Sequence, residues 1–136
     1  MENCIFCKIL KNEIPSATVY EDDKFRGIMD IAPVAKGHVI LLAKEHTANL
    51  LEADDELLAA ALPAVKKVAN AVKKTVDCDG INVLQNNGEA AGQTVFHLHI
   101  HVMPRYSKDK VAIPAPQAAY ADGEAAELAK KIAGNL

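Results

Sequence analysis

The sequence predicts an α+β fold in which five antiparallel strands form one sheet, with one long helix and short terminal helices. Three observations support this prediction: a strictly alternating stretch at 96–104, an apolar run at 39–43, and a helical apolar periodicity over 54–76. The predicted helices are too few to cover both faces of a wholly parallel sheet, so we expect antiparallel pairing. At 136 residues, the chain is long enough for one domain around a single core.

The first third of the chain alternates between short elements and turns. Residues 4–11 place apolar side chains on one side of a short helical turn, and Pro15 breaks this segment. Residues 17–21 and 25–29 are predicted strands that an acidic turn joins into a hairpin. The run 39–43 is almost wholly apolar, as expected for a strand that is covered on both faces in the middle of a sheet.

Residues 54–76 form the predicted main helix. Asp54 or Asp55 can cap its start, where negative charge is favourable. Pro63 lies inside the pattern and costs a backbone hydrogen bond, so we expect a kink or a restart of the helix there. Apolar side chains recur every three or four residues, and the expected core-facing positions are Leu58, Leu62, Val65, Ala69, Val72 and Val76.

The remaining elements are shorter. Residues 81–85 are a predicted strand, and a small, polar loop at 86–94 leads into the alternating stretch. From residue 107 onward, two prolines and several alanines indicate an extended arm. A last helix is expected over 124–133, ended by Gly134.

The alternating stretch contains His97, His99 and His101, each separated from the next by one aliphatic residue. Residues two apart on a strand share a face, so we expect the three imidazoles on one side of the sheet. A helix would point His99 away from the other two. Pro104 removes a backbone donor and is expected to end the strand. The aliphatic residues expected to enter a core on the other side are Leu98, Ile100 and Val102.

Charge and composition narrow the possible partners. A net charge of −3 gives no general attraction to nucleic acid or to an anionic membrane, so any phosphate chemistry must come from a local site. The N-terminus has no signal pattern, and no apolar run reaches transmembrane length. We therefore expect a cytoplasmic protein with reduced cysteines and with neither nucleic-acid nor membrane partners.

Cys4 and Cys7 supply two thiolates at the usual zinc spacing, which is half of a metal site. The missing ligands would be distant histidines, and His46 and one histidine of the stretch at 96–104 are natural candidates. Two alternatives are a redox pair, which the bulky intervening residues disfavour, and two buried thiols. For His46, an exposed loop position is an equal alternative.

The same histidines also suit catalysis. One imidazole can attack while a neighbour donates a proton, and a histidine nucleophile suits phosphorus because the resulting P–N bond is easily hydrolysed. The sequence has no nucleophile elbow, Walker loop or dinucleotide-binding fingerprint. The loop from Gly88 to Thr94 offers backbone N–H groups, an amide and a hydroxyl for phosphate oxygens, although a plain turn is the alternative.

Residues 92–105, Gly-Gln-Thr-Val-Phe-His-Leu-His-Ile-His-Val-Met-Pro-Arg, resemble the signature of the histidine-triad (HIT) nucleotide-binding proteins, His-φ-His-φ-His-φ-φ with φ hydrophobic. The resemblance covers roughly residues 3–106 and is closest to the bacterial branch related to the phosphoramidase-type members. It implies one HIT domain over 1–136, with 107–136 as a C-terminal arm and helix. It also implies a homodimer in which two five-stranded sheets join into one of ten strands. Further matching segments lie at 86–88, 37–39, 30–33 and 4–9.

The resemblance implies a hydrolase that cleaves an α-phosphorus bond of purine nucleoside phosphoramidates, or of related conjugates with an AMP or GMP moiety. His99 would be the nucleophile and form a nucleotidyl-histidine intermediate. His101 would bind the phosphate and, with His38, complete the hydrogen-bond network of the triad. Alternatives are a dinucleoside polyphosphate hydrolase, a nucleotide-binding regulator with vestigial hydrolysis, and a metalloenzyme whose strand histidines bind a catalytic ion.

Further site residues are implied by position. Asp30 and Ile31 match the segment that holds the ribose. The implied apolar base pocket contains Ile5, Phe6, Ile9 and Ile28. The implied contacts to phosphate and leaving group come from Asn86, Gln93 and Thr94, although the family often has Ser where Thr94 stands. A structural zinc, one per chain, would be bound by Cys4, Cys7, His46 and His97, and no catalytic metal is expected.

Overall fold

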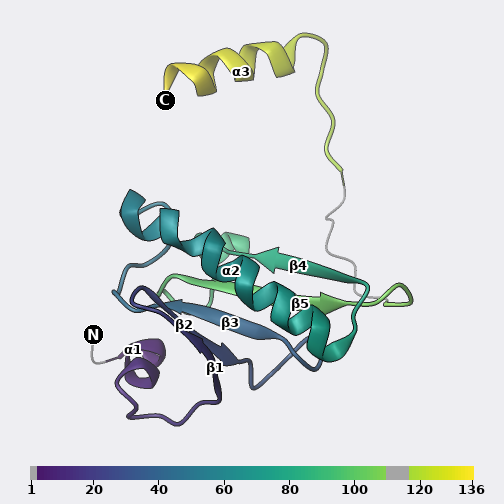
Figure 1. Cartoon of the computed structure of the whole chain (residues 1–136). Helices are drawn as coiled ribbons and strands as arrows, with labels where there is room; N and C mark the ends of the chain where they lie inside the picture. The colour runs from purple at the N-terminus through teal and green to yellow at the C-terminus, as the bar shows by residue number, and fades with distance from the viewer. Residues whose placement is uncertain (1–2, 110–116) are drawn as a thin grey trace.

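Five strands form one antiparallel sheet, as predicted, and their order is β1-β2-β3-β5-β4 (Figure 1). The computed structural model describes residues 3–109 and 117–136. The strands are β1 (Thr18–Glu21), β2 (Phe25–Met29), β3 (Val39–Ala43), β4 (Gly80–Leu84) and β5 (His99–Arg105). The helices are α1 (Ile5–Leu10), α2 (Asp55–Val76), the short 3₁₀ helix η1 (Glu89–Ala91) and α3 (Glu124–Gly134).

β3 is the central strand, and its five residues are all buried. It pairs with β2 on one side and with β5 on the other. The register places Leu42 opposite His99 and Ile40 opposite His101. Directly paired residues on neighbouring strands point to the same face of a sheet. The two histidines therefore lie on the face that carries Ile40 and Leu42.

The two faces of the sheet have separate cores. α2 crosses one face (Figure 1), where Leu41 of β3 packs with apolar residues of β5 and of the helix. Leu98, Ile100 and Val102 belong to this core, which confirms the predicted aliphatic side of the alternating stretch. On the opposite face, α1 contributes to a smaller core whose buried members are Phe6, Ile9, Ile28, Ile40 and Leu42.

α2 differs from its prediction in two respects. It runs without interruption through Pro63, so the helix does not restart there. Leu62, predicted in the core, is 69 % exposed. The small side chains of Ala61 and Ala64 face the sheet instead and let the helix approach it closely, which turns Leu62 outward. The buried positions are Leu57, Ala61, Ala64, Val65, Val68 and Val72.

β5 also differs at both ends. It begins at His99, so His97 and Leu98 precede the strand, although Leu98 still exchanges main-chain hydrogen bonds with Ala43 and Thr47. Pro104 does not end the strand, which continues to Arg105. The pairing of β3 with β5 stops at Val102, so Pro104 has a strand partner only on the β4 side, and its missing donor is tolerated.

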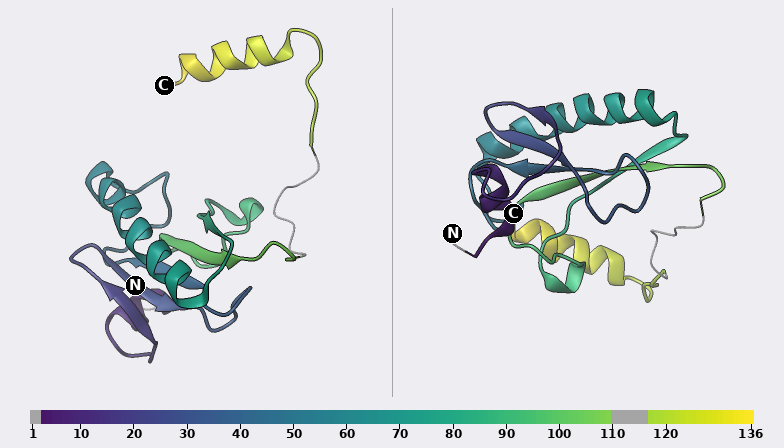
Figure 2. Two further views of the ribbon diagram at one scale, coloured as in Figure 1. Left: turned by 45° about the vertical axis from the view of Figure 1, so that its right-hand side comes forward. Right: turned by 90° about the horizontal axis from the view of Figure 1, so that it is seen from below.

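The C-terminal helix lies apart from the sheet (Figures 1 and 2). Every residue from 117 to 136 is exposed in the chain. None of the helices in the described part of the chain combines the length and apolar character that crossing a membrane requires.

Candidate active site

His99 is fixed in one tautomer by a main-chain carbonyl. Its Nδ1 lies 2.6 Å from the carbonyl oxygen of His97. A carbonyl can only accept a hydrogen bond, so Nδ1 carries the proton and Nε2 of the neutral ring keeps a lone pair. Burial lowers the pKa of His99, against the opposing effects of this carbonyl and of Asp30. The ring is therefore neutral at pH 7, with Nε2 able to act as a nucleophile.

His38 and His101 form a relay whose proton positions follow in the same way. The amide of Val34 donates to Nδ1 of His38 at 3.2 Å, so the proton of His38 lies on Nε2. That Nε2–H donates to Nδ1 of His101 at 2.9 Å. His101 therefore carries its own proton on Nε2, which is an available donor for an anion.

The surroundings of His101 keep its ring, and so its Nε2–H donor, neutral. Burial, followed by the neighbouring His99 and His38, lowers the pKa of His101 to about 4. Asp30 opposes this shift, and its carboxylate lies 3.4 Å from Nε2 of His38. Burial also lowers the pKa of His38, again with Asp30 opposing. His101 at pH 7 thus offers a hydrogen bond rather than a positive charge.

The position of His38 depends on the preceding glycine. Gly37 has φ +100°, a conformation that residues with a side chain rarely adopt. A Cβ at this position would also lie 3.0 Å from Cγ1 of Val76 on α2. Gly37 therefore lets the chain pass close under α2 and enter β3 with His38 facing β5.

The predicted base-pocket residues fall into two groups. Phe6 packs edge-on against His99, with ring centroids 4.9 Å apart. Ile9 and Ile28 are buried with Phe6 in the smaller core, beneath the histidines. Ile5 is 45 % exposed. On the segment implied for the ribose, Ile31 is almost fully exposed, and Asp30 accepts a hydrogen bond from the amide of Ala32.

Gln93 holds the loop at 86–94 in place. Its Oε1 accepts from the amide of Gly88 and from Asn49, while its Nε2 donates to the carbonyls of Ala48 and Val95. This buried amide thus has all its partners within the chain, so in this conformation Gln93 positions the loop. The amides of residues 91–93 also bond within the loop. They are therefore not the free phosphate donors that the sequence suggested.

The other predicted loop residues lie at the surface or close to it. Asn86 is half-buried beside Gly92. Thr94 is exposed and lines an open pocket of about 740 Å³. Phe96 and Ile5 line the same pocket, together with Cys4 and His46.

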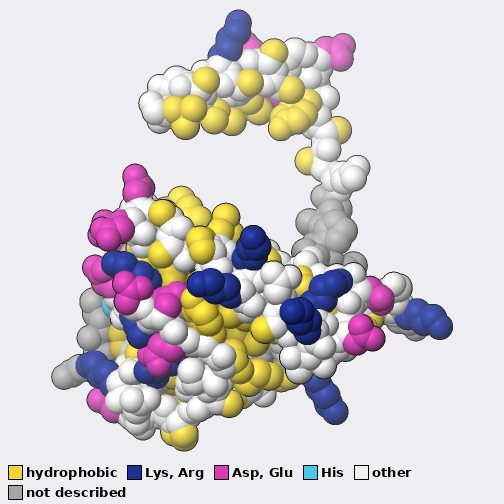
Figure 3. All heavy atoms as spheres, in the orientation of Figure 1, with side chains coloured by type: hydrophobic (Ala, Val, Ile, Leu, Met, Phe, Trp, Pro, Cys, Tyr) yellow, Lys and Arg dark blue, Asp and Glu magenta, His cyan; other side chains and the backbone are white. Residues whose placement is uncertain are grey.

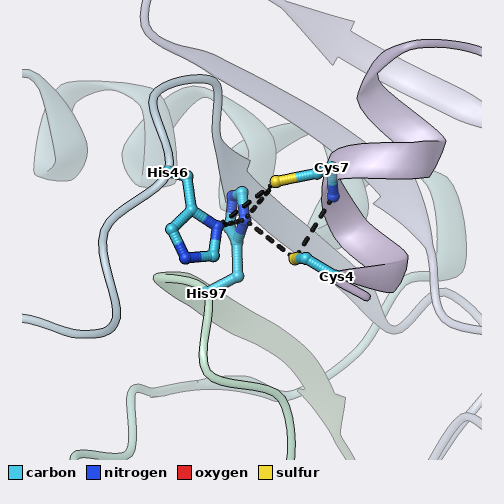
Figure 4. Close-up of side chains that lie close together, drawn as sticks. All are labelled: Cys4, Cys7, His46 and His97. Atoms are coloured by element: carbon cyan, nitrogen blue, oxygen red, sulfur yellow. Dashed lines mark hydrogen bonds between the residues drawn. The ribbon is translucent and has the colours of Figure 1, made fainter. Parts of the chain in front are cut away.

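The second cluster gathers the four predicted metal ligands (Figure 4). Cys4 caps the start of α1, Cys7 lies in its first turn, His46 follows β3, and His97 precedes β5. Nδ1 of His97 lies 3.4 Å from Sγ of Cys4 and 3.5 Å from Sγ of Cys7. Nδ1 of His46 lies 3.2 Å from Sγ of Cys7 and 3.0 Å from Nδ1 of His97.

The donor atoms fit a tetrahedral metal ion. Nε2 of His97 donates to the carbonyl of Ala43 at 2.7 Å, so the lone pair on Nδ1 faces the cluster. Zinc bonds of about 2.0–2.3 Å place neighbouring ligand atoms of a tetrahedron roughly 3.3–3.8 Å apart, close to the observed separations. Two sulfur and two imidazole donors form a set that is common in structural zinc sites. The cluster is therefore compatible with a structural zinc.

Several functional contacts were not predicted from the sequence. The groups that fix the tautomers are the amide of Val34 and the carbonyls of Ala43 and His97. Every residue has main-chain groups, so the amino-acid type does not show which of them will contact a histidine. Asn49, which donates a hydrogen bond to Gln93, is not part of any motif in the sequence either.

Comparison with known proteins identifies the family. The HIT domain model matches residues 11–108. The protein Hit of Bacillus subtilis is 50 % identical over 107 residues, covering 79 % of this chain and 74 % of that protein. An adenosine 5′-monophosphoramidase of Schizosaccharomyces pombe is 43 % identical, covering 79 % and 77 %. An adenylylsulfatase of Arabidopsis thaliana is 41 % identical, covering 79 % of this chain and 54 % of that one.

Solved structures agree over most of the chain. A crystal structure from Streptococcus mutans has 38 % identity and a TM-score of 0.94, covering 99 % of this chain and 86 % of that one. A zinc-bound histidine triad family protein from Mycobacterium smegmatis has 34 % identity and a TM-score of 0.78, covering 98 % of each. The matches in sequence and in fold, together with the triad geometry, show that this chain belongs to the HIT domain family.

Proposed function

We propose that this protein is a nucleotide hydrolase that cleaves an α-phosphorus bond through a nucleotidyl group on His99. The observation that carries the proposal is the pair of assigned tautomers: a lone pair on Nε2 of His99 beside a proton on Nε2 of His101. The names of relatives, adenosine 5′-monophosphoramidase and adenylylsulfatase, support a substrate with an AMP moiety. A purine nucleoside phosphoramidate or a related conjugate meets this description.

In the proposed reaction, Nε2 of His99 attacks the α-phosphorus, and the bond from phosphorus to the leaving group breaks as the N–P bond forms. The Nε2–H of His101 donates to a phosphate oxygen, and His38 holds that ring in the required tautomer. The carbonyl of His97 stabilises the positive charge that develops on the attacking imidazole. Water then cleaves the nucleotidyl-histidine and releases the nucleotide. For the contacts to the base, the ribose and the phosphate, we propose the residues that the family resemblance implies.

We propose a structural role for one zinc per chain at Cys4, Cys7, His46 and His97. The ion would tie α1 to the loop after β3 and to the start of β5. His97 would then be committed to the metal through its side chain and to His99 through its carbonyl. On this proposal zinc supplies rigidity, and the bond cleavage needs only the protein's own side chains.

We also propose a homodimer in which the sheets of two chains join through β4 into ten strands. β4 is an edge strand, and its sequence Gly-Ile-Asn-Val-Leu carries no charge. The other edge, β1, has a bulge, and its Glu21 pairs with Lys44 and Arg26. Charges and bulges are devices that prevent edge pairing, so β4 is the edge suited to a partner.

The test compares the wild type with His99→Ala on an adenosine phosphoramidate and on a diadenosine polyphosphate. We expect turnover to be lost in His99→Ala, while Lys66→Ala, on the exposed side of α2, keeps it. Mass spectrometry of acid-quenched wild type should find the nucleotidyl group on His99. A quenched enzyme that turns over without a nucleotidyl group on any residue would refute the mechanism.

The comparison of substrates separates the alternatives. A higher kcat/KM on the phosphoramidate supports the proposed class, and a higher value on the dinucleotide identifies a dinucleoside polyphosphate hydrolase instead. Tight binding of AMP or GMP with negligible turnover of either substrate would identify a nucleotide-binding regulator. Activity that disappears on chelation and returns with metal, in an enzyme that stays folded, would point to a metalloenzyme.

A further inference from the structure

The C-terminal helix α3 has two different sides. Leu128 is 40 % exposed and Ile132 is 64 % exposed. Glu127 and Lys130 lie on the opposite side, by helical spacing. Figure 3 shows hydrophobic side chains gathered on the side of α3 that is turned toward the rest of the molecule. The apolar side, by the same spacing, consists of Ala125, Leu128, Ala129 and Ile132.

An isolated helix of this kind needs a surface to pack on. α3 has 11 residues, and none of them is buried within the chain. Helices shorter than roughly 12–15 residues are marginal in water even for favourable sequences, because nucleation is costly and packing supplies most of the stability. The apolar side of α3 therefore has no covering surface among the described residues of its own chain.

The position of α3 is shared with a crystal structure. The Streptococcus mutans chain superimposes with a TM-score of 0.94 over 99 % of this chain. Residues 117–136 make up about a seventh of the chain. If the related chain placed this segment elsewhere, such a score could not be reached. The segment that contains α3 thus occupies a closely similar position in two chains of 38 % identity, although none of its residues is buried in this one.

The location of α3 indicates what holds it. α3 lies beyond β4, the uncharged edge of the sheet (Figure 1), and on the side of the sheet opposite α2 (Figure 2). A second chain that paired along β4 would extend the sheet in that direction and bring its own surface beside α3. We infer that α3 packs on a second copy of this chain, across the joined edges, so that the two copies exchange their C-terminal helices. This inference rests on the homodimer proposed above.

A dimer with twofold symmetry contains this contact twice, so a substitution in α3 acts at both copies. The first test is therefore the dissociation constant of the dimer, measured by sedimentation equilibrium. The double variant Leu128→Ala/Ile132→Ala removes apolar area while keeping helix-favouring residues. We expect its dissociation constant to rise by roughly a hundredfold. The matched control Glu127→Ala/Lys130→Ala, on the opposite side of the same helix, should stay within about threefold of the wild type.

The second test identifies which chain α3 touches. Dimers assembled from isotope-labelled and unlabelled full-length chains should give isotope-filtered NOEs from the methyl groups of Leu128 and Ile132 to methyl groups of the other chain. If those NOEs arise within one chain, or are absent while the wild type is a dimer, the exchange is refuted and the homodimer stands. A monomeric wild type would refute both. A double variant that dimerises like its control would also refute the exchange.

Discussion

Replacing His101 by Asn tests whether burial keeps this histidine neutral. In the folded chain the pKa of His101 is lowered from 6.5 to about 4, chiefly by burial and then by His99 and His38. As pH falls, the unfolded chain therefore takes up this proton first, and the proton favours unfolding. The destabilisation begins near the unfolded pKa of 6.5 and levels off near the folded value of about 4. Between pH 7 and pH 5 it amounts to about 2 kcal/mol.

Asn is a suitable substitute because its Oδ1 can accept the hydrogen bond that Nε2 of His38 now donates to Nδ1 of His101. Urea unfolding at pH 7 and at pH 5, at constant ionic strength, gives the free energy of unfolding of each protein. We expect the wild type to lose about 2 kcal/mol more than His101→Asn over this interval. Groups that do not contact position 101 titrate alike in both proteins, so their contributions cancel in the difference. Equal losses in the two proteins would refute the argument.

Three further outcomes are expected. Asp30→Asn should lower the pKa of His38 further, because the Asp30 carboxylate now raises it; an NMR titration of the His38 ring that shows an equal or higher pKa would contradict this. Chelation should lower the thermal midpoint of the wild type by several degrees but leave that of Cys7→Ser unchanged, because the variant lacks one of the four ligands. A similar shift in both proteins would argue against this site, and metal analysis should find about one zinc per wild-type chain and much less in Cys7→Ser. Pro63→Ala should raise the free energy of unfolding by about 1–2 kcal/mol in urea, because it restores a backbone donor on the exposed side of α2; an unchanged or lower value would show that the helix is adapted to its proline.

The repeat of apolar residues along the sequence was sufficient to predict most of the fold. The apolar run at 39–43 identified the central strand, and single-residue alternation identified the two sides of the chain around His99. Helical periodicity located α2 within one residue at its start and selected most of its covered side, but it misplaced Leu62. Leu62 and Ala61 are neighbours on the helix surface, and only the packing distance to the sheet decides which of them is covered.

The candidate site could be predicted less well from such patterns. The Cys4 and Cys7 spacing indicated half of a metal site, with His46 and one strand histidine as candidate ligands, whereas the choice of His97 came from the family resemblance. Alternation indicated only that the three strand histidines share a face. Their separate tautomers depend on contacts made in three dimensions. Two of these, from His97 to the carbonyl of Ala43 and from His38 to His101, link segments far apart in the sequence. The phosphate and ribose contacts remain predictions.

The hydrogen bond from His99 to the carbonyl of His97 has an evolutionary consequence. The acceptor belongs to the main chain, so it persists whatever side chain stands at position 97. A lineage could therefore discard the two cysteines and the two histidines of this cluster, one substitution at a time, and still inherit the same tautomer of His99. The Cys/His cluster and the His99 ring are adjacent in the chain but separately heritable, provided that other packing replaces the stability that a bound metal would supply.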